Sequence, residues 1–297
     1  MLKAITLVHK GAMEIAVHSI RSFARYFSTT HTLTIHTDPS TDENDHRLLL
    51  EAASGIEAKI VASKERGDRV KELLLSYPKT QSLVSMGTFY TKLEVPMFEE
   101  APYFFFDSDI IWLRPVTNLV PLKKPNAFST ESWTWYNGIS NHMRWINAQT
   151  PRRVNSGFHY LGQQFPYKKM EDMLAQGMFD PTNIAATDQE IFAYLYNEME
   201  YYHPEDLKRS RVGSIYPLVD EHCAALHFPG KMWSTHLDQI KQLPKQATKP
   251  AMHIRFEPAM PLTVTELLRM RVQVRMGNST LLAKPLNLVR KMLRAYR

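Results

Sequence analysis

The first half of the chain alternates short apolar runs with stretches whose apolar residues recur every three or four positions. Strands are predicted where the runs are apolar or β-branched, at residues 4–8, 32–36, 58–62 and 103–106. Helices are predicted where the helical period dominates, at residues 14–26, 70–75 and 89–98. The last of these helices should be interrupted or ended near Pro96. This alternating order of strands and helices predicts an α/β fold with a largely parallel sheet.

Beyond Pro115 the pattern becomes less regular. Residues 129–149 are rich in Trp, Asn and Ser and predict loop with short helices. The remaining predicted elements are a strand at 158–161, helices at 168–176 and 188–199, and a last buried strand at 224–228. No internal repeat and no linker is evident. We therefore expect one large domain, residues 1–262, followed by a C-terminal segment, residues 263–297.

The positive charge of the chain is concentrated in that C-terminal segment. Residues 264–297 contain eight Lys and Arg and one acid, Glu266. Eight positive charges less one negative charge give this segment a net charge of +7, which exceeds the net charge of +6 of the whole chain. The large domain is therefore close to neutral, which argues against a nucleic-acid-binding fold. Residues 287–296 place apolar side chains on one helical face and basic ones mostly elsewhere. This pattern is typical of a helix on an anionic membrane surface, but also of a helix packed on its own domain or in a dimer.

The cysteine content and the lengths of the apolar runs indicate in which cellular compartment the protein would be found. Cys223 is the single cysteine, so no internal disulfide can form. The apolar run at 4–8 is too short for a signal peptide, and no run approaches the 18 or so residues that span a bilayer. We expect a cytoplasmic protein, with the C-terminal segment as a candidate peripheral contact to the inner face of the membrane.

Two carboxylates follow the apolar run 103–106 directly, in the segment Asp107-Ser108-Asp109. Carboxylates are costly inside a core, but they are tolerated where a buried strand ends, which is where open α/β sheets form ligand crevices. Residues i and i+2 of a strand point the same way, and carboxylate oxygens suit Mg²⁺ or Mn²⁺. The pair predicts a metal site that could neutralise a diphosphate, although an Asp pair that merely caps a turn has the same pattern.

A phosphatase of the haloacid dehalogenase type also carries an apolar strand followed by Asp-X-Asp. Such enzymes have Thr or Val two residues after the second Asp, where this chain has Ile111. They place this strand near the N-terminus, whereas three predicted strands come first here. They also need a later pair of acidic residues, for which Asp220-Glu221 is the nearest candidate. The phosphatase is therefore the alternative interpretation.

Five motifs occur in a fixed order along residues 3–235. They are Phe89-Tyr-Thr-Lys92-Leu-Glu-Val-Pro96, Asp107-Ser108-Asp109 with Leu113-Arg114-Pro115, Val154-Asn155-Ser156-Gly157-Phe158, Thr187-Asp188-Gln189-Glu190, and His227-Phe-Pro-Gly230-Lys231-Met232-Trp233. In this order they resemble the GT-A nucleotide-sugar glycosyltransferases, and most closely retaining family 8, the group of glycogenin and the lipopolysaccharide galactosyltransferases. The resemblance implies a GT-A fold, a Rossmann-like, mixed but mainly parallel sheet flanked by helices, with the basic helical segment appended.

The resemblance also implies roles for individual residues. Asp107, Asp109 and His227 would bind Mn²⁺ or Mg²⁺. The donor, a UDP-sugar, would be bound by the residues Val8, His9, Lys92, Asp107, Ser108, Asn155, Ser156, Gly230 and Lys231. Within that set, Val8 and His9 lie where the family binds uracil and ribose, and Gly230 and Lys231 where it binds the diphosphate. Asp188 and Gln189 would be catalytic, with Gln189 near the anomeric carbon.

Two of the motifs depart from the family pattern. Lys92 stands where the family usually has Arg, which keeps the charge. Lys231 follows Gly230 directly instead of after two residues, and Met232 replaces a usual Pro, so this loop should be tighter. Each motif alone also has a plain structural interpretation: His227 as a core histidine, Asn155-Ser156-Gly157 as a turn, and Asp188 as a favourable start of a helix.

The implied reaction is metal-dependent transfer of a hexose from a UDP-sugar to a hydroxyl of a glycan or glycolipid, such as a lipopolysaccharide-type acceptor, with retention of configuration. A catalytically silent sugar-nucleotide-binding protein is a third interpretation beside the phosphatase. No nucleic-acid partner is expected.

Overall fold

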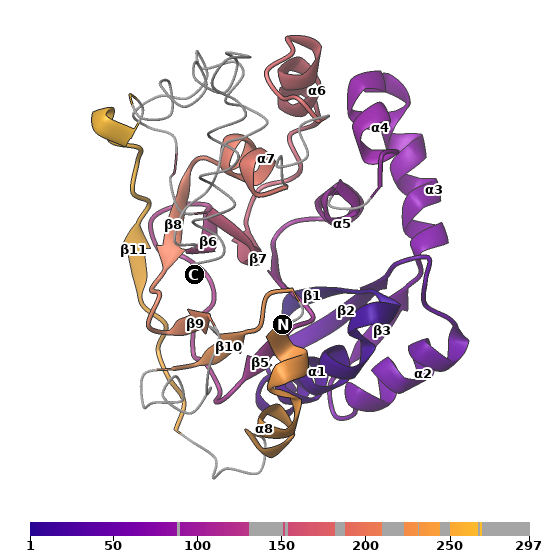
Figure 1. Cartoon of the computed structure of the whole chain (residues 1–297), viewed down its shortest axis with the longest axis vertical. Coiled ribbons are helices and arrows are strands. Elements are labelled where there is room, and N and C mark those ends of the chain that lie inside the picture. Colours follow the sequence, from indigo (N-terminus) through magenta and orange to yellow (C-terminus); the bar gives the residue numbers. More distant parts are fainter. Residues whose placement is uncertain are drawn as a thin grey trace, which may run out of the picture.

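The computed structural model describes residues 1–87, 90–130, 151, 154–181, 188–209, 223–230, 232–243, 250–266 and 268. A mixed sheet of eight strands forms its centre, in the order β11-β8-β6-β7-β4-β1-β2-β3 (Figure 1). The strands are β1 (Leu2–Val8), β2 (His31–Thr37), β3 (Ala58–Val61), β4 (Tyr103–Phe106), β6 (Asn126–Thr130), β7 (Val154–Leu161), β8 (Met199–Tyr202) and β11 (Phe256–Pro258). Six of these strands run in one direction, and β7 and β11 run against them.

Helices cover both faces of this sheet. One face carries α1 (Met13–Phe27) and α2 (Glu43–Ala52). The other carries α3 (Ser63–Leu73), α4 (Pro78–Val84), α5 (Thr91–Phe98), α6 (Tyr167–Ala175) and α7 (Asp188–Leu195). Strand β4 is buried on both faces: Phe104 and Phe106 pack toward α1, and Phe105 packs toward the opposite helices. A strand with both faces covered must be apolar throughout, as this one is.

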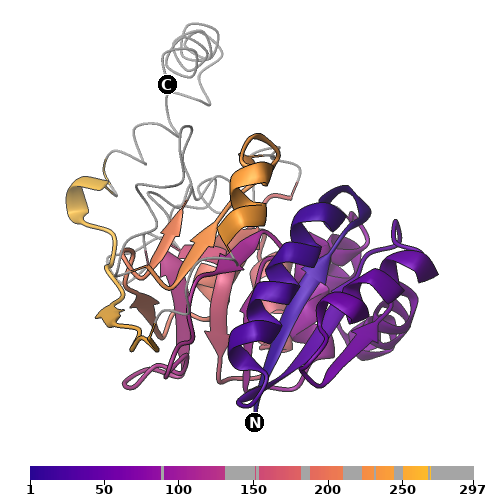
Figure 2. The same ribbon diagram turned by 90° about the horizontal axis from the view of Figure 1, so that it is seen from below.

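A second, three-stranded sheet lies beside the end of β4. It is built in the order β5-β10-β9 from β5 (Ile110–Trp112), β10 (Ala225–His227) and β9 (Leu207–Arg209). Helix α8 (Leu237–Gln242) packs with β5, β10 and α1 in one apolar cluster, and Figure 2 shows α8 beside α1. Because β10 pairs antiparallel with β5, this sheet brings His227 opposite Ile110, directly after the Asp pair.

Most of the expected elements of the first half are confirmed. The first four residues of the helix predicted at 70–75 belong to a longer helix, α3, and the last two lie in the 3-10 turn that follows it at Leu74–Ser76. Pro96 does not interrupt α5, which runs on to Phe98. Helices α2 and α4 were not predicted. Both have weaker apolar faces than α1, with buried side chains only at scattered positions.

The second half departs further from expectation. The helix predicted at 188–199 ends at Leu195, and Met199 instead begins strand β8. The predicted helix was too long because residues from Met199 on pair with β6 and β11, a long-range interaction that the local helical pattern does not record. The strand predicted at 158–161 begins earlier, at Val154. The buried strand predicted at 224–228 is β10, Ala225–His227, and the later strand β11 is only partly buried.

The predicted boundary at residue 262 stays a prediction, because only residues 263–266 and 268 of the C-terminal segment belong to the described part. The loop predicted at 129–149 also lies mostly outside it. Among the described residues, no helix has the length and apolarity needed to cross a membrane.

Candidate metal and donor site

The Asp pair lies at the carboxyl edge of the large sheet, in the turn between β4 and β5. The backbone N–H of Asp107 donates to the carbonyl of Gly157 on β7 at 2.6 Å. The turn closes when the N–H of Ile110 donates to the carbonyl of Asp107 at 3.1 Å. Since β7 runs antiparallel to β4, its first residues meet the last residue of β4 at this edge. The topology therefore places Asn155, Ser156 and Gly157 beside the carboxylates.

His227 approaches the same carboxylates from the second sheet. Its Nε2 lies 3.3 Å from Oδ1 of Asp109 and 3.9 Å from Oδ2 of Asp107. Asp109 also receives the backbone N–H of Phe228 on its own carbonyl, at 3.0 Å, which fixes the two segments together. One ligand atom from each of these three residues lies within 4.8 Å of the others. The predicted metal ligands are thus brought together.

Two observations show that this cluster fits a divalent cation. Oδ1 of Asp109 is buried and accepts no hydrogen bond from the described residues, a costly state that a cation would relieve. Gly157 provides the space: a Cβ at this position would lie 2.5 Å from Oδ2 of Asp107 and 3.0 Å from Cε1 of His227. Two carboxylates and an imidazole are also a suitable donor set for Mn²⁺ or Mg²⁺.

Lys92 joins the cluster from α5. Its Nζ lies 2.6 Å from Oδ1 of Asp107 and 4.0 Å from Oδ2 of Asp188, the first residue of α7. Ser156 donates its hydroxyl to the same Oδ2 of Asp188 at 2.6 Å. The ammonium of Lys92 therefore neutralises two carboxylates that would otherwise repel each other, and the serine fixes the orientation of one of them.

The charges of this cluster determine its titration. Burial lowers the pKa of Lys92, but the charges of Asp107 and Asp188 outweigh burial and leave the pKa raised. Burial raises the pKa of Asp107, but Lys92 and His227 outweigh it, so this pKa is lowered. For Asp188 burial prevails over the same ammonium, and the pKa is raised. The two acids that share Lys92 are thus shifted in opposite directions, as is common at functional sites.

Other predicted residues take less direct positions. Asn155 is nearly buried, and its Oδ1 accepts from the backbone N–H of Gly157 at 2.8 Å and from Ser129 at 3.3 Å, so it shapes the start of β7. Ser108 is buried inside the Asp-X-Asp turn. Gln189 follows Asp188 on α7 and is partly buried. Its catalytic role stays a prediction.

The predicted nucleotide residues lie at or after the ends of strands of both sheets. Val8 ends β1, the strand next to β4, and its side chain is fully buried, so only its backbone could face a ligand. His9 follows it and is exposed. Gly230 has a φ of +66°, which favours glycine, and no atom lies within 4 Å of a Cβ placed there. Lys231 and Thr187 lie outside the described residues.

Gly157 is the site residue that was missing from the predicted set. Its signal was present in the motif Asn155-Ser156-Gly157, where an interior strand glycine indicates close approach of another group.

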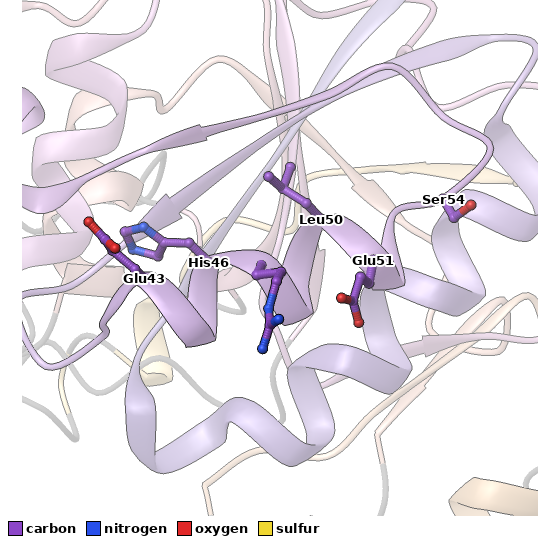
Figure 3. A pocket seen from close by; sticks show the side chains of 6 residues that line it. Glu43, His46, Leu50, Glu51 and Ser54 are labelled. Atoms are coloured by element: carbon purple, nitrogen blue, oxygen red, sulfur yellow. The ribbon is translucent and has the colours of Figure 1, made fainter.

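A hollow on the outer surface of α2 is lined by Glu43, His46, Arg47, Leu50, Glu51 and Ser54 (Figure 3). It contains none of the residues of the cluster, and we assign no function to it.

Comparison with known proteins defines the fold. No family model and no curated protein matches this sequence. Among solved structures, mouse xyloside xylosyltransferase 1 in its apo form is similar over 78% of this chain and 98% of its own, at 12% identity and a TM-score of 0.53. The galactosyltransferase LgtC in complex with donor and acceptor sugar analogues is similar over 84% and 97%, at 10% identity and a TM-score of 0.51. The chain therefore has the GT-A fold of these proteins.

Proposed function

We propose that the protein is a metal-dependent glycosyltransferase that moves a hexose from a UDP-sugar to a hydroxyl of a glycan or glycolipid acceptor, with retention of configuration. The observation that carries this proposal is the cluster of Asp107, Asp109 and His227 at the carboxyl edge of the sheet. These three residues would hold Mn²⁺ or Mg²⁺. The cation, when bound, would supply charge stabilisation for a diphosphate leaving group.

The side chains around the cluster suit a charged donor. Lys92 supplies a fixed positive charge beside Asp107, where it can meet a phosphate oxygen or a sugar hydroxyl. Asp188, oriented by Ser156, offers acceptors for sugar hydroxyls. Gln189 would then lie near the anomeric carbon and orient the reacting groups. Electrostatic stabilisation by groups that are already in place is commonly the largest contribution to catalysis of this type.

The principal test is substitution of Asp109 by Asn, which removes the charge and keeps the shape. We expect turnover of UDP-sugars with Mn²⁺ to fall at least about 100-fold, because even residues one step removed from a metal typically cost 10–100-fold. Asp172→Asn is the matched control, since the Asp172 side chain is half-exposed on α6 and its ion pair among the described residues is with Lys168, at 3.4 Å. Normal turnover by Asp109→Asn would show that the site is wrongly placed.

The same assay separates the other interpretations. The phosphatase alternative has no support from the fold, because both solved structures cited above are glycosyltransferases by their descriptions. Hydrolysis of phosphate esters without sugar transfer would nevertheless favour it. Binding of UDP-sugars without any turnover would favour a silent binding protein. An inverted anomeric product, read by NMR, would contradict retention and leave metal-dependent transfer standing.

A further inference from the structure

A buried network of charged side chains ties α5 to the edge of the large sheet. Arg66 of α3 is fully buried, and its Nε donates to Oε2 of Glu94 on α5 at 2.9 Å. Its NH1 donates to the carbonyl of Thr37, the last residue of β2, at 2.9 Å. One guanidinium thus joins α3, α5 and β2 at the edge where the metal cluster lies.

A second link holds the far end of the same helix. Glu99, directly after α5, receives His36 of β2 on Oε1 at 2.7 Å and Lys3 of β1 on Oε2 at 3.0 Å. Glu94 is thus linked through Arg66 to Thr37 of β2, and Glu99 is linked directly to His36 of the same strand. The helix is therefore fixed in position along its length as well as by apolar packing.

Lys92 lies about half a turn before Glu94 on α5, and its ammonium faces the site. Only Leu93 separates it from Glu94. Its ammonium lies 2.6 Å from Asp107 and 5.4 Å from the centre of the Phe105 ring. The four-carbon stem of lysine can follow only a limited movement of its helix, so the reach of the ammonium to Asp107 depends on where α5 is held. A displacement of α5 beyond that reach would move the ammonium away from Asp107.

The chemistry of the network favours a role in positioning over a role in stability. A buried Arg–Glu pair is weak evidence for stability, because apolar residues of similar volume often serve as well. Moreover, NH2 of Arg66 is buried and has no hydrogen-bond partner in the part of the chain that the structure describes, which is unfavourable. What the guanidinium does supply is a rigid planar fork that defines direction at two of its nitrogens.

We propose that Arg66 and Glu94 are positioning residues of the metal and donor site, which fix α5 so that Lys92 lies against Asp107 and Asp188. The inference rests on the proposed function only in taking Asp107 as a metal ligand. It predicts that Glu94 influences the metal cluster through Lys92 and by no other route.

The test is a double-mutant cycle read by Mn²⁺ affinity, measured by isothermal titration calorimetry on four proteins: the parent, Glu94→Gln, Lys92→Met and the double variant. Lys92→Met should tighten Mn²⁺ binding, because it removes a cation that competes for Asp107. Glu94→Gln should also tighten it several-fold in the parent, since Lys92 is no longer held in place. In the Lys92→Met background the same change should have no effect.

The sign of the effect makes this test decisive. If Glu94 acted only as a nearby negative charge, its removal would weaken Mn²⁺ binding in both backgrounds, and this outcome would overturn the proposal. Equal changes in both backgrounds would overturn it too. Glu72→Gln is the matched control, because Glu72 is an exposed acid on α3 and should leave Mn²⁺ affinity unchanged.

Two further measurements keep the inference separate from folding and from the proposed function. Arg66→Lys keeps the charge but loses the fork, and it should act like Glu94→Gln if the latter does not fold. If the parent itself binds no Mn²⁺, the metal assignment fails. A crystal structure of Glu94→Gln then tests whether Glu94 positions Lys92. Lys92 should have left Asp107 in that structure, and an unchanged separation of 2.6 Å would overturn the proposal. Absence of sugar transfer with the expected cycle would contradict only the proposed function.

Discussion

Gly157 illustrates at the scale of one residue how closely the site is packed. Its missing side chain leaves room for Asp107, Asn155 and His227 to approach one another, with each within 3.0 Å of where a Cβ would be. Two of these three groups belong to the metal cluster. A strand interior normally loses stability from a glycine, so the position is best explained by this close approach.

We predict that Gly157→Ala lowers Mn²⁺ affinity at least about 10-fold, because the methyl group would displace the carboxylate and the imidazole from each other. The melting temperature should fall as well, since overpacking typically costs about 1–3 kcal/mol. Calorimetric titration with Mn²⁺ checks the first expectation, and a thermal unfolding curve checks the second.

Gly162 offers the comparison that separates strain from loss of the site. A Cβ there would clash with the carbonyl of Pro125, at the opposite end of β7 from the cluster. Gly162→Ala should therefore destabilise the fold by a similar amount and leave Mn²⁺ affinity unchanged. If both variants lose Mn²⁺ to the same extent, general destabilisation explains the effect and Gly157 has no special role.

At the scale of the element, α3 carries a glycine with no evident purpose. Gly67 lies inside the helix, and no atom lies within 4 Å of a Cβ placed there. Alanine is favoured over glycine in a helix interior by about 0.5–1 kcal/mol. We predict that Gly67→Ala raises the free energy of unfolding by about that amount, measured by urea unfolding. A loss of stability would mean that the neighbouring Arg66 needs this flexibility.

The elements also show how far sequence reasoning reached. Helix α1 and strands β1, β2 and β4 were predicted because each buries one clear apolar pattern. The end of α7 was missed because Tyr201 and Tyr202 are buried by strand pairing that no local pattern records. The grouping of Asp107, Asp109 and His227 came from the resemblance, since nothing in the sequence fixes the distance between residues so far apart. Arg66 gave no signal, because charged residues are mostly expected at the surface.

At the scale of the whole molecule, several buried histidines link stability to pH. Burial lowers the pKa of His31 to about 4 and that of His159 to about 3. In the unfolded chain both histidines would have a pKa of about 6.5. The unfolded state therefore binds more protons as the pH falls below 6.5, and the folded state loses stability there. Glu99, with its pKa lowered to about 2 by His36 and Lys3 in spite of burial, adds to the loss below about pH 4.5.

We predict that stability falls steeply between pH 6 and pH 4, with each of the two histidines contributing about 1.4 kcal/mol per pH unit. His31→Gln should reduce the pH dependence of the unfolding free energy by about one proton, because it removes one of the two titrating groups. The His31 ring packs against Phe23 and Phe27 and not at the metal cluster, so the substitution leaves the site intact. Urea unfolding at several pH values checks this. The same slope in His31→Gln and the parent would contradict the assignment.

The pairing of β10 with β5 has a consequence for how the protein is made. The two carboxylates emerge from the ribosome early, but the imidazole that completes their cluster emerges more than a hundred residues later. A nascent chain that stops short of His227 could build β1, β2 and β4 and still lack the third ligand. Acquisition of the cation with all three ligands would then have to wait until His227 has left the ribosome, and a chain released before that point would lack the imidazole ligand.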